Sequence, residues 1–200
     1  EIALMSHKMD IDVWEVIDAA KTKPFGFMPF YPGPGLGGHC IPIDPFYLSW
    51  KARQNGFECR FIELAGAVNS SMPEYVVTRV ADALNSVKKP INGSRVHLFG
   101  IAYKRDVNDM RESPALDIIE LLIRRGATVT YSDMWVPSFD HGGHAMTEVP
   151  FEKAIAADYD CAVIATDHAA FDYEKIAKMP LVVDTRNALK GVTGPNIFKL

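Results

Sequence analysis

The first part of the chain places apolar residues at helical spacing on either side of an irregular stretch. Between Asp10 and Lys21, apolar side chains recur every three or four residues, which predicts an amphipathic helix with Asp10 as a candidate N-cap. The prolines and glycines that follow, as far as Pro42, break both helix and strand. A second helix is predicted from Asp44, whose carboxylate would be its N-cap, to a stop at Gly56.

Residues 61–87, FIELAGAVNSSMPEYVVTRVADALNSV, predict two helices separated by a break or kink at Ser-Ser-Met-Pro. The second of these helices points Tyr75, Val76, Val80 and Leu84 inward. This apolar stripe is wide enough for a contact between subunits or domains, and packing within the chain explains it equally well.

From residue 92 the pattern changes to short apolar strands that alternate with helices. Strands are predicted within residues 94–103, 128–133, 159–166 and 181–185, with 196–200 as an edge strand, and helices within 113–126, 151–157 and 171–179. This alternation is typical of a parallel sheet covered by helices on both faces. We therefore expect a helical part over residues 1–91 and an α/β part over residues 92–200.

Composition narrows the class of protein. The chain has 200 residues, a net charge of −4, 48% hydrophobic and 23% charged residues, which is an ordinary globular composition without a basic surface for nucleic acid. No apolar run approaches the roughly 20 residues that cross a bilayer. Its three cysteines are odd in number and scattered, which disfavours a disulfide framework and favours a reducing cytoplasm. The chain begins without Met in what looks like a helical region, so we expect a fragment of a longer protein.

The candidate chemistry lies in FYPGPGLGGHCIPIDPFYL, residues 30–48, where glycines and prolines surround Cys40. Glycines permit close backbone approach and anion binding by successive amides. Each part has an ordinary explanation: the glycines as a structural turn, Cys40 as a packed cysteine and Asp44 as a helix cap. The combination G-G-H-C-x-P-x-D-P is much more specific. A zinc site is disfavoured because no paired ligand spacing appears. A cysteine hydrolase is disfavoured because no histidine partner is evident.

This pattern resembles the nucleotide-sugar 6-dehydrogenases, the family that contains UDP-glucose dehydrogenase. PGPGLGGHCIPIDPFYLSWKA is most similar to the branch that acts on UDP-N-acetylhexosamines, such as the UDP-N-acetylglucosamine and UDP-N-acetylmannosamine dehydrogenases. The UDP-glucose branch usually has Ser or Tyr at His39 and Lys at Ile43. GIAYKRDVNDMRESPALDIIELL and VVDTRNAL resemble two further family elements, so the resemblance spans essentially the whole chain.

The resemblance implies an α/β protein with part of a central helical domain, residues 1–91, followed by a Rossmann-like parallel-sheet domain that binds UDP, residues 92–200. It implies that the C6 alcohol of a UDP-N-acetylhexosamine is oxidised to a uronic acid with two NAD+. Cys40 matches the nucleophile that forms a thiohemiacetal and then a thioester. Asp44 matches an aspartate that assists water activation or proton handling.

The remaining site residues are also implied by the resemblance. Arg111 matches a cofactor contact, although it also suits the start of a helix. Lys104 matches a substrate contact, although a solvated surface lysine is its ordinary explanation, and His39 either contacts the N-acetyl sugar or holds the loop. The other expected substrate contacts are Tyr31, Pro32, Gly33, Pro34, Gly35, Leu36, Gly37 and Arg186.

The resemblance further implies a UDP-sugar as substrate, a homodimer formed through the central helices and a cytoplasmic role in polysaccharide synthesis. The NAD-binding domain and the oxyanion-stabilising residues of the family have no counterpart in these 200 residues. We therefore expect the chain alone not to reduce NAD+ and to bind UDP weakly. Two alternatives stay open: a UDP-glucose 6-dehydrogenase, and a non-catalytic module for UDP binding or dimerisation. The accessibility of Cys40 distinguishes the module from the enzymes.

Overall fold

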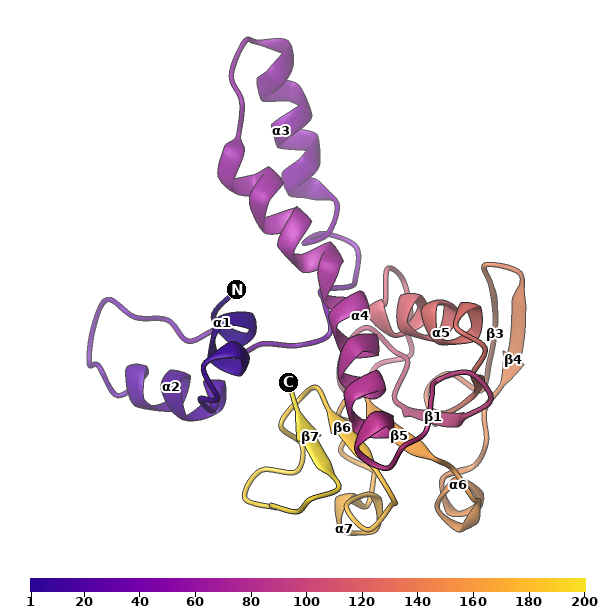
Figure 1. The fold of residues 1–200 in the computed structure, drawn as a ribbon. Helices are drawn as coiled ribbons and strands as arrows, with labels where there is room; N and C mark the ends of the chain where they lie inside the picture. Colours follow the sequence, from indigo (N-terminus) through magenta and orange to yellow (C-terminus); the bar gives the residue numbers. More distant parts are fainter.

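The computed structural model describes all residues from Glu1 to Leu200. An α/β body carries a protruding pair of helices, and two short helices lie beside the body near the C-terminus (Figure 1). The helices are α1 (Ile2–Lys8), α2 (Val13–Ala20), α3 (Asp44–Gln54), α4 (Arg60–Ser86), α5 (Pro114–Arg124), α6 (Phe151–Ala156) and α7 (Tyr173–Ile176). The strands are β1 (Arg95–Phe99), β2 (Thr128–Ser132), β3 (Ser138–His141), β4 (His144–Thr147), β5 (Cys161–Ile164), β6 (Val182–Asp184) and β7 (Ile197–Lys199). No helix is both long and apolar enough to span a membrane.

The α/β fold predicted from the alternating pattern is confirmed. Five strands form one sheet in the order β2-β1-β5-β6-β7, and every neighbouring pair is parallel, with β7 at an edge. Side chains of β1 alternate between two cores: Val96 and Leu98 face the core that contains α4 and α5, whereas Phe99 faces the core that contains α6 and α7. The sheet is therefore covered on both faces, as parallel sheets usually are.

The carboxyl ends of the parallel strands meet at one edge of the sheet. Phe99 of β1 pairs with Ser132 of β2 and with Ile164 of β5, which in turn pairs with Asp184 of β6. The loops that leave these strands therefore lie next to one another. In open α/β sheets, this edge is where ligands bind.

Of the break or kink predicted at Ser-Ser-Met-Pro, the break does not occur, because α4 continues through Pro73. A proline inside a helix removes one backbone hydrogen bond and costs about 3 kcal/mol. Here the turns that follow are held by the body, since Val76, Val80 and Leu84 are completely buried. Packing of these side chains outweighs the local preference of the proline. The expected inward face is thus confirmed for these three residues, whereas Tyr75 is only half-buried.

Two predicted helix N-caps are wrong, because in each case another residue occupies the capping position. The N-cap of α2 is Asp12, whose Oδ1 accepts from the Trp14 N–H at 2.8 Å, while Asp10 lies outside the helix with φ +55°. Asp44 is the first residue inside α3, Ile43 occupies the capping position, and no side chain caps that end. The Asp44 carboxylate is therefore left free of a capping role.

The β3–β4 hairpin was not predicted. It follows β2 and turns at Gly142 and Gly143, both with positive φ. The Gly-Gly pair between two short apolar-polar runs is the signal that would have indicated it. Its tip lies against α5, since a Cβ at Gly142 would be 3.7 Å from Oε2 of Glu120.

The protruding limb consists of α3 and the first half of α4. Gly66 of α4 leaves room for the ring of Phe46 from α3. Glu63 accepts hydrogen bonds from the Ser49 hydroxyl and from the Arg53 guanidinium, the latter at 3.0 Å. Several large apolar side chains of the limb are nevertheless exposed: Phe46, Tyr47, Leu48, Trp50, Phe57, Phe61 and Leu64.

Candidate functional site

The glycine-rich loop lies directly against the carboxyl edge of the sheet. A Cβ built on Gly33 would lie 2.9 Å from a terminal nitrogen of Arg186, which follows β6. A Cβ on Gly37 would lie 2.6 Å from the carbonyl oxygen of Glu112, in the connection between β1 and α5. At Gly37 the neighbouring atom belongs to the backbone, so only glycine permits this close approach, and the loop can lie on the strand ends.

Two hydrogen bonds fix the position of the glycine-rich loop. The Gly38 N–H donates to the carbonyl of Arg111 at 2.9 Å, and Gly38 has a φ of +95°. The Leu36 N–H donates to Oδ1 of Asn69 at 2.9 Å. Asn69 belongs to α4, and nothing in the sequence pattern pointed to this residue. The loop is therefore tied to both the body and the long helix.

Cys40 is exposed at the end of this loop. Its carbonyl accepts from the N–H groups of Ile43 at 3.1 Å and Asp44 at 2.8 Å, so a tight turn leads from the thiol into α3. Its Sγ lies 3.9 Å from Nδ1 of His39. By contrast, Cys161 is buried in β5, and burial raises the pKa of its thiol to about 12. Of these two thiols, only Cys40 is placed for chemistry with a ligand.

A pocket of about 320 Å³ is lined in part by His39, which directly precedes Cys40 in the loop, and by Arg111 and His141. Arg111 is exposed and holds Asp109 with both its Nε, at 3.0 and 3.1 Å, and a terminal nitrogen, at 2.7 Å. These hydrogen bonds raise the pKa of Arg111 and lower that of Asp109. His141 belongs to the hairpin that sequence reasoning missed.

A second pocket, of about 330 Å³, lies at the other end of the loop beside Tyr31 and Arg186. The Tyr31 ring stacks on Trp14 of α2, with centroids 5.9 Å apart and ring planes at 17°. Asp18 of α2 binds Lys21 at 2.6 Å and Lys190 at 2.9 Å, and these hydrogen bonds hold the pKa of Asp18 far below its usual range. The pocket is thus bordered by α2 on one side and by the body on the other.

Arg186 is held in place by the turn after β6. Its Nε donates to the carbonyl of Ala165 at 2.8 Å, and its backbone N–H donates to Oδ1 of Asp184 at 3.0 Å. Burial lowers the pKa of Arg186 and raises that of Asp184. Its neighbour Asn187 lines the same pocket with φ +53°, and its Oδ1 is buried without a partner. Asn187 was part of the VVDTRNAL element but was not singled out as a site residue.

The structure separates the predicted site residues into groups along one edge. Tyr31, Pro32 and Arg186 line the second pocket, whereas His39 and Arg111 line the first. Between these groups, Pro34 is buried, Gly35 lies against Pro114, and Leu36 is exposed. Lys104 is exposed and lines neither pocket; its Nζ lies 5.3 Å from the centre of the Tyr103 ring, which packs against Gly38.

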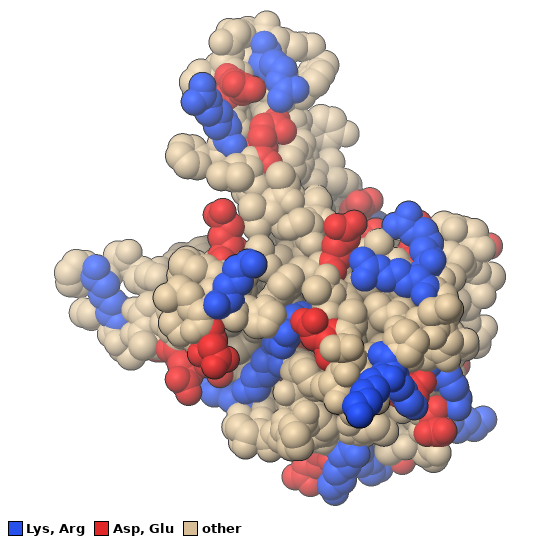
Figure 2. Space-filling view, viewed as in Figure 1, with Lys and Arg blue, Asp and Glu red and all other residues tan.

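The glycine-rich loop is neither a dinucleotide-binding turn nor part of a metal-ligand cluster. Gly33 to Gly38 match the letters G-x-G-x-x-G, but they join α2 to α3 and not a strand to a helix, so they do not form a dinucleotide-binding turn. No group of three or more His, Cys, Asp or Glu side chains is arranged to hold a metal ion. Basic and acidic side chains are interspersed over the face shown in Figure 2, which therefore carries no extended patch of one sign.

Comparison with known proteins agrees with this geometry. Residues 97–191 match the UDP-binding domain, and residues 1–71 the central domain, of the UDP-glucose/GDP-mannose dehydrogenase family. The chain is 34% identical over 199 residues to the UDP-N-acetyl-D-mannosamine dehydrogenase of Methanococcus maripaludis strain C7, covering 95% of this chain and 44% of that protein. It is 34% identical over 171 residues to the UDP-N-acetyl-D-glucosamine 6-dehydrogenase of Pseudomonas aeruginosa, covering 86% and 40%.

A solved structure is similar over nearly the whole chain. The UDP-D-ManNAc dehydrogenase of Pyrococcus horikoshii superposes with a TM-score of 0.83 at 28% identity, covering 99% of this chain and 46% of that one. This chain thus spans less than half the length of these relatives. Its two matched segments together include the thiol loop, both pockets, strands β2, β5 and β6 and most of β1, and the chain belongs to the UDP-glucose/GDP-mannose dehydrogenase family.

Proposed function

We propose that these 200 residues form the thiol-bearing and UDP-binding part of an NAD-dependent dehydrogenase that oxidises the C6 alcohol of a UDP-N-acetylhexosamine to a uronic acid. The observation that carries the proposal is the exposed thiol of Cys40 on a glycine-rich loop seated against the strand ends. The relatives named above act on UDP-N-acetylhexosamines, which supports this substrate class over UDP-glucose. A free nucleophilic thiol suits a reducing compartment such as the cytoplasm.

In this proposal Cys40 converts an aldehyde into a species that loses a second hydride. The aldehyde formed from the alcohol accepts the Cys40 thiolate at its carbonyl carbon, and protonation of the oxygen gives a thiohemiacetal. Loss of hydride and a proton gives a thioester. Water then cleaves the carbon–sulfur bond, which releases the carboxylate and returns the thiol. The chemistry that bound NAD+ supplies is acceptance of one hydride in each oxidation.

Asp44 and His39 flank the thiol in the proposed reaction. Asp44 is exposed, has no capping role, and begins a helix four residues after Cys40. These features suit a carboxylate that takes a proton from the attacking water. His39 lies next to the thiol and lines the first pocket, where it would contact the sugar or hold the loop.

The nucleotide is proposed to lie along the loop from Tyr31 to Gly37. Arg186 offers terminal nitrogens next to Gly33, and an arginine suits phosphate oxygens. Lys104 would add a second positive charge from the α/β part, residues 92–200. Arg111 fits an edge contact with a cofactor phosphate, because its exposed guanidinium borders the pocket beside Cys40.

We also propose that the full protein is a homodimer formed through its central helices. The exposed apolar side chains of α3 and the first half of α4 support this assembly, because soluble monomers rarely expose so many large apolar groups together. The inward face from Tyr75 to Leu84 is instead used within the chain, since Val76, Val80 and Leu84 pack against the body.

Protection of Cys40 from alkylation tests the proposed function. Saturating UDP-N-acetylglucosamine is expected to slow iodoacetamide labelling of Cys40 several-fold, because the sugar would cover the thiol. Calorimetry with UDP is expected to give weak binding, with a Kd near ~1 mM, that weakens about tenfold in Arg186→Gln and is unchanged in the limb variant Arg60→Gln. Absence of both protection and UDP binding contradicts the proposal. NADH production by the 200 residues alone would contradict the expectation that they do not turn over.

A further inference from the structure

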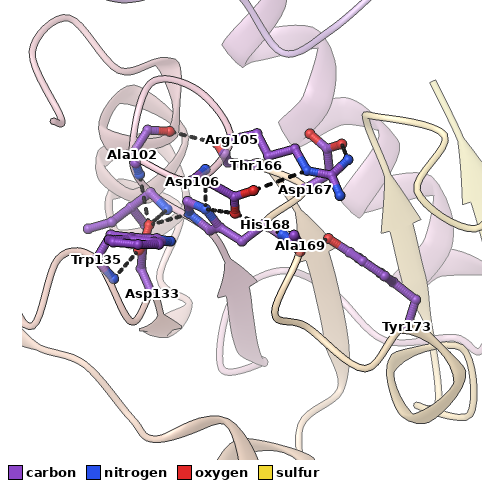
Figure 3. Close-up of polar contacts among 11 residues, drawn as sticks. Ala102, Arg105, Asp106, Asp133, Trp135, Thr166, Asp167, His168, Ala169 and Tyr173 are labelled. Atoms are coloured by element: carbon purple, nitrogen blue, oxygen red, sulfur yellow. Dashed lines mark hydrogen bonds and ion pairs between the residues drawn. The ribbon is translucent and has the colours of Figure 1, made fainter. Parts of the chain in front are cut away.

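A buried carboxylate–histidine pair lies beneath the loop that carries Lys104. Asp133 follows β2 and His168 follows β5, and both side chains are completely buried. Nε2 of His168 lies 3.0 Å from Oδ2 of Asp133 (Figure 3). The same Oδ2 accepts from the N–H groups of Ile101 at 2.7 Å and Ala102 at 2.9 Å. Three donors therefore converge on one carboxylate oxygen.

The hydrogen bonds define the state of the histidine. Nδ1 of His168 accepts from the N–H of Asp106 at 2.9 Å, so this nitrogen carries no proton. Nε2 then carries the proton and donates it to Asp133. Burial acts to raise the pKa of Asp133, but the donors from His168, Ala102 and Ile101 outweigh it and lower that pKa. The pair is thus a neutral imidazole hydrogen-bonded to a carboxylate.

Together the two side chains hold the loop after β1 at two points. Asp133 holds its start at Ile101 and Ala102, and His168 holds its turn at Asp106. Tyr103 and Lys104 lie between these points. The Tyr103 ring packs against Gly38, two residues before Cys40, as shown by the 2.9 Å separation between a ring atom and a Cβ built on Gly38.

We propose that Asp133 and His168 act as positioning residues for the loop from Ile101 to Asp106. By holding this loop, they place Tyr103 against the Cys40 loop and Lys104 beside the phosphates of the UDP-sugar. The proposal rests on the proposed function. Neither residue touches the ligand in this assignment. Their effect passes through the backbone amides that they hold.

A second buried histidine provides a matched control. His97 is also completely buried in the same sheet, and its ring nitrogens lie 2.7 Å from Oγ1 of Thr130 and 2.9 Å from Oγ of Ser132. Its side chain makes none of the hydrogen bonds to the Ile101–Asp106 loop. His97→Phe therefore removes a buried imidazole without releasing that loop.

Three variants of His168 separate the effects of its two hydrogen bonds, to Asp133 and to the Asp106 N–H. His168→Phe removes both hydrogen bonds. His168→Gln offers an amide N–H near the Nε2 position and retains a donor to Asp133, whereas His168→Asn offers a carbonyl near the Nδ1 position and retains an acceptor for the Asp106 N–H. Comparison of Gln and Asn shows which end of the loop matters more for binding.

The binding experiment measures UDP affinity by calorimetry together with unfolding by urea. His168→Phe is expected to raise the Kd for UDP about tenfold or more, with Gln and Asn intermediate, while His97→Phe changes it less than about twofold despite lower stability. Equal increases in Kd in His168→Phe and His97→Phe overturn the proposal, because the loss of any buried imidazole would then explain them. If His168→Phe does not fold, the Gln and Asn variants give the same comparison.

Amide hydrogen exchange gives a readout that needs no ligand. His168→Phe is expected to speed exchange at Ile101, Ala102 and Asp106 at least about tenfold more than His97→Phe does. Unchanged exchange at these amides contradicts the positioning role, whatever the UDP result. If the unmodified chain binds no UDP, the proposed function fails, and the exchange data still decide whether the pair holds the loop.

Discussion

The two halves of α4 belong to one helix but have opposite surroundings. In the second half, Val76, Val80 and Leu84 are completely buried against the sheet and α5. In the first half, Phe61 is 87% exposed and Leu64 is 51% exposed. The apolar residues of the second half therefore stabilise the body, whereas those of the first half are free for contacts beyond this chain.

This difference extends to the chemistry. The body contains the buried Cys161 and the buried polar groups at the strand ends. The limb and the adjoining loop contain the exposed Cys40, His39 and Asp44. The predicted catalytic groups thus lie where packing is incomplete, next to a rigid sheet.

The largest expected difference between the regions is in thiol reactivity. A thiol with a pKa of about 12, as in Cys161, is ionised in roughly one molecule in 10⁴ at pH 8. Burial blocks its access as well. We expect iodoacetamide to modify Cys40 at least about a thousandfold faster than Cys161, measured by peptide mass spectrometry. Similar rates for the two cysteines would show that the folded body does not protect its core.

The same leucine truncation in the two halves of α4 is expected to have unequal effects on folding. Leu84→Ala leaves a cavity in the body and should lower the free energy of unfolding by about 3 kcal/mol. Leu64→Ala removes an exposed side chain and should change it by less than about 0.5 kcal/mol. Urea denaturation followed by circular dichroism measures both. A large loss of stability in Leu64→Ala would mean that the first half of α4 is covered in solution, for example by a second copy of the chain.

Acid is expected to destabilise the packed region through His97. Burial lowers the pKa of His97 to about 3, whereas an unfolded histidine has a pKa near 6.5. Between these values the unfolded chain binds the proton and the folded chain does not, so stability is full above pH 6.5 and falls as the pH drops toward 3. From pH 6.5 to 4.5 this contribution is about 2 to 3 kcal/mol.

Urea unfolding across this pH range measures that contribution. His97→Phe should be less stable than the unmodified chain at pH 7 but should lose less of its stability on acidification. Equal losses in both proteins would assign the acid sensitivity to other groups. The partners of the His97 ring nitrogens are the hydroxyls of Thr130 and Ser132, so the imidazole is the titrating group of this hydrogen-bonded cluster.

Local patterns in the sequence determined most of the elements and their order. The short apolar runs predicted the strands, and Ser113-Pro114 with Gly126 predicted α5, because residues close in sequence control dihedral angles and hydrogen bonds within one turn. The combination of glycines, Cys40 and Asp44 pointed to the thiol loop. The roles of individual site residues stay predictions until binding is measured.

Only the tertiary structure decided how these pieces meet. Helix α4 continues through Pro73, because packing against side chains that are distant in sequence outweighs the loss of one backbone hydrogen bond. The tertiary structure also brought Asn69 to the loop and His168 to Asp133, pairs separated by 33 and 35 residues. Such contacts depend on how the chain packs in three dimensions, and no pattern within a short window of sequence contains that information.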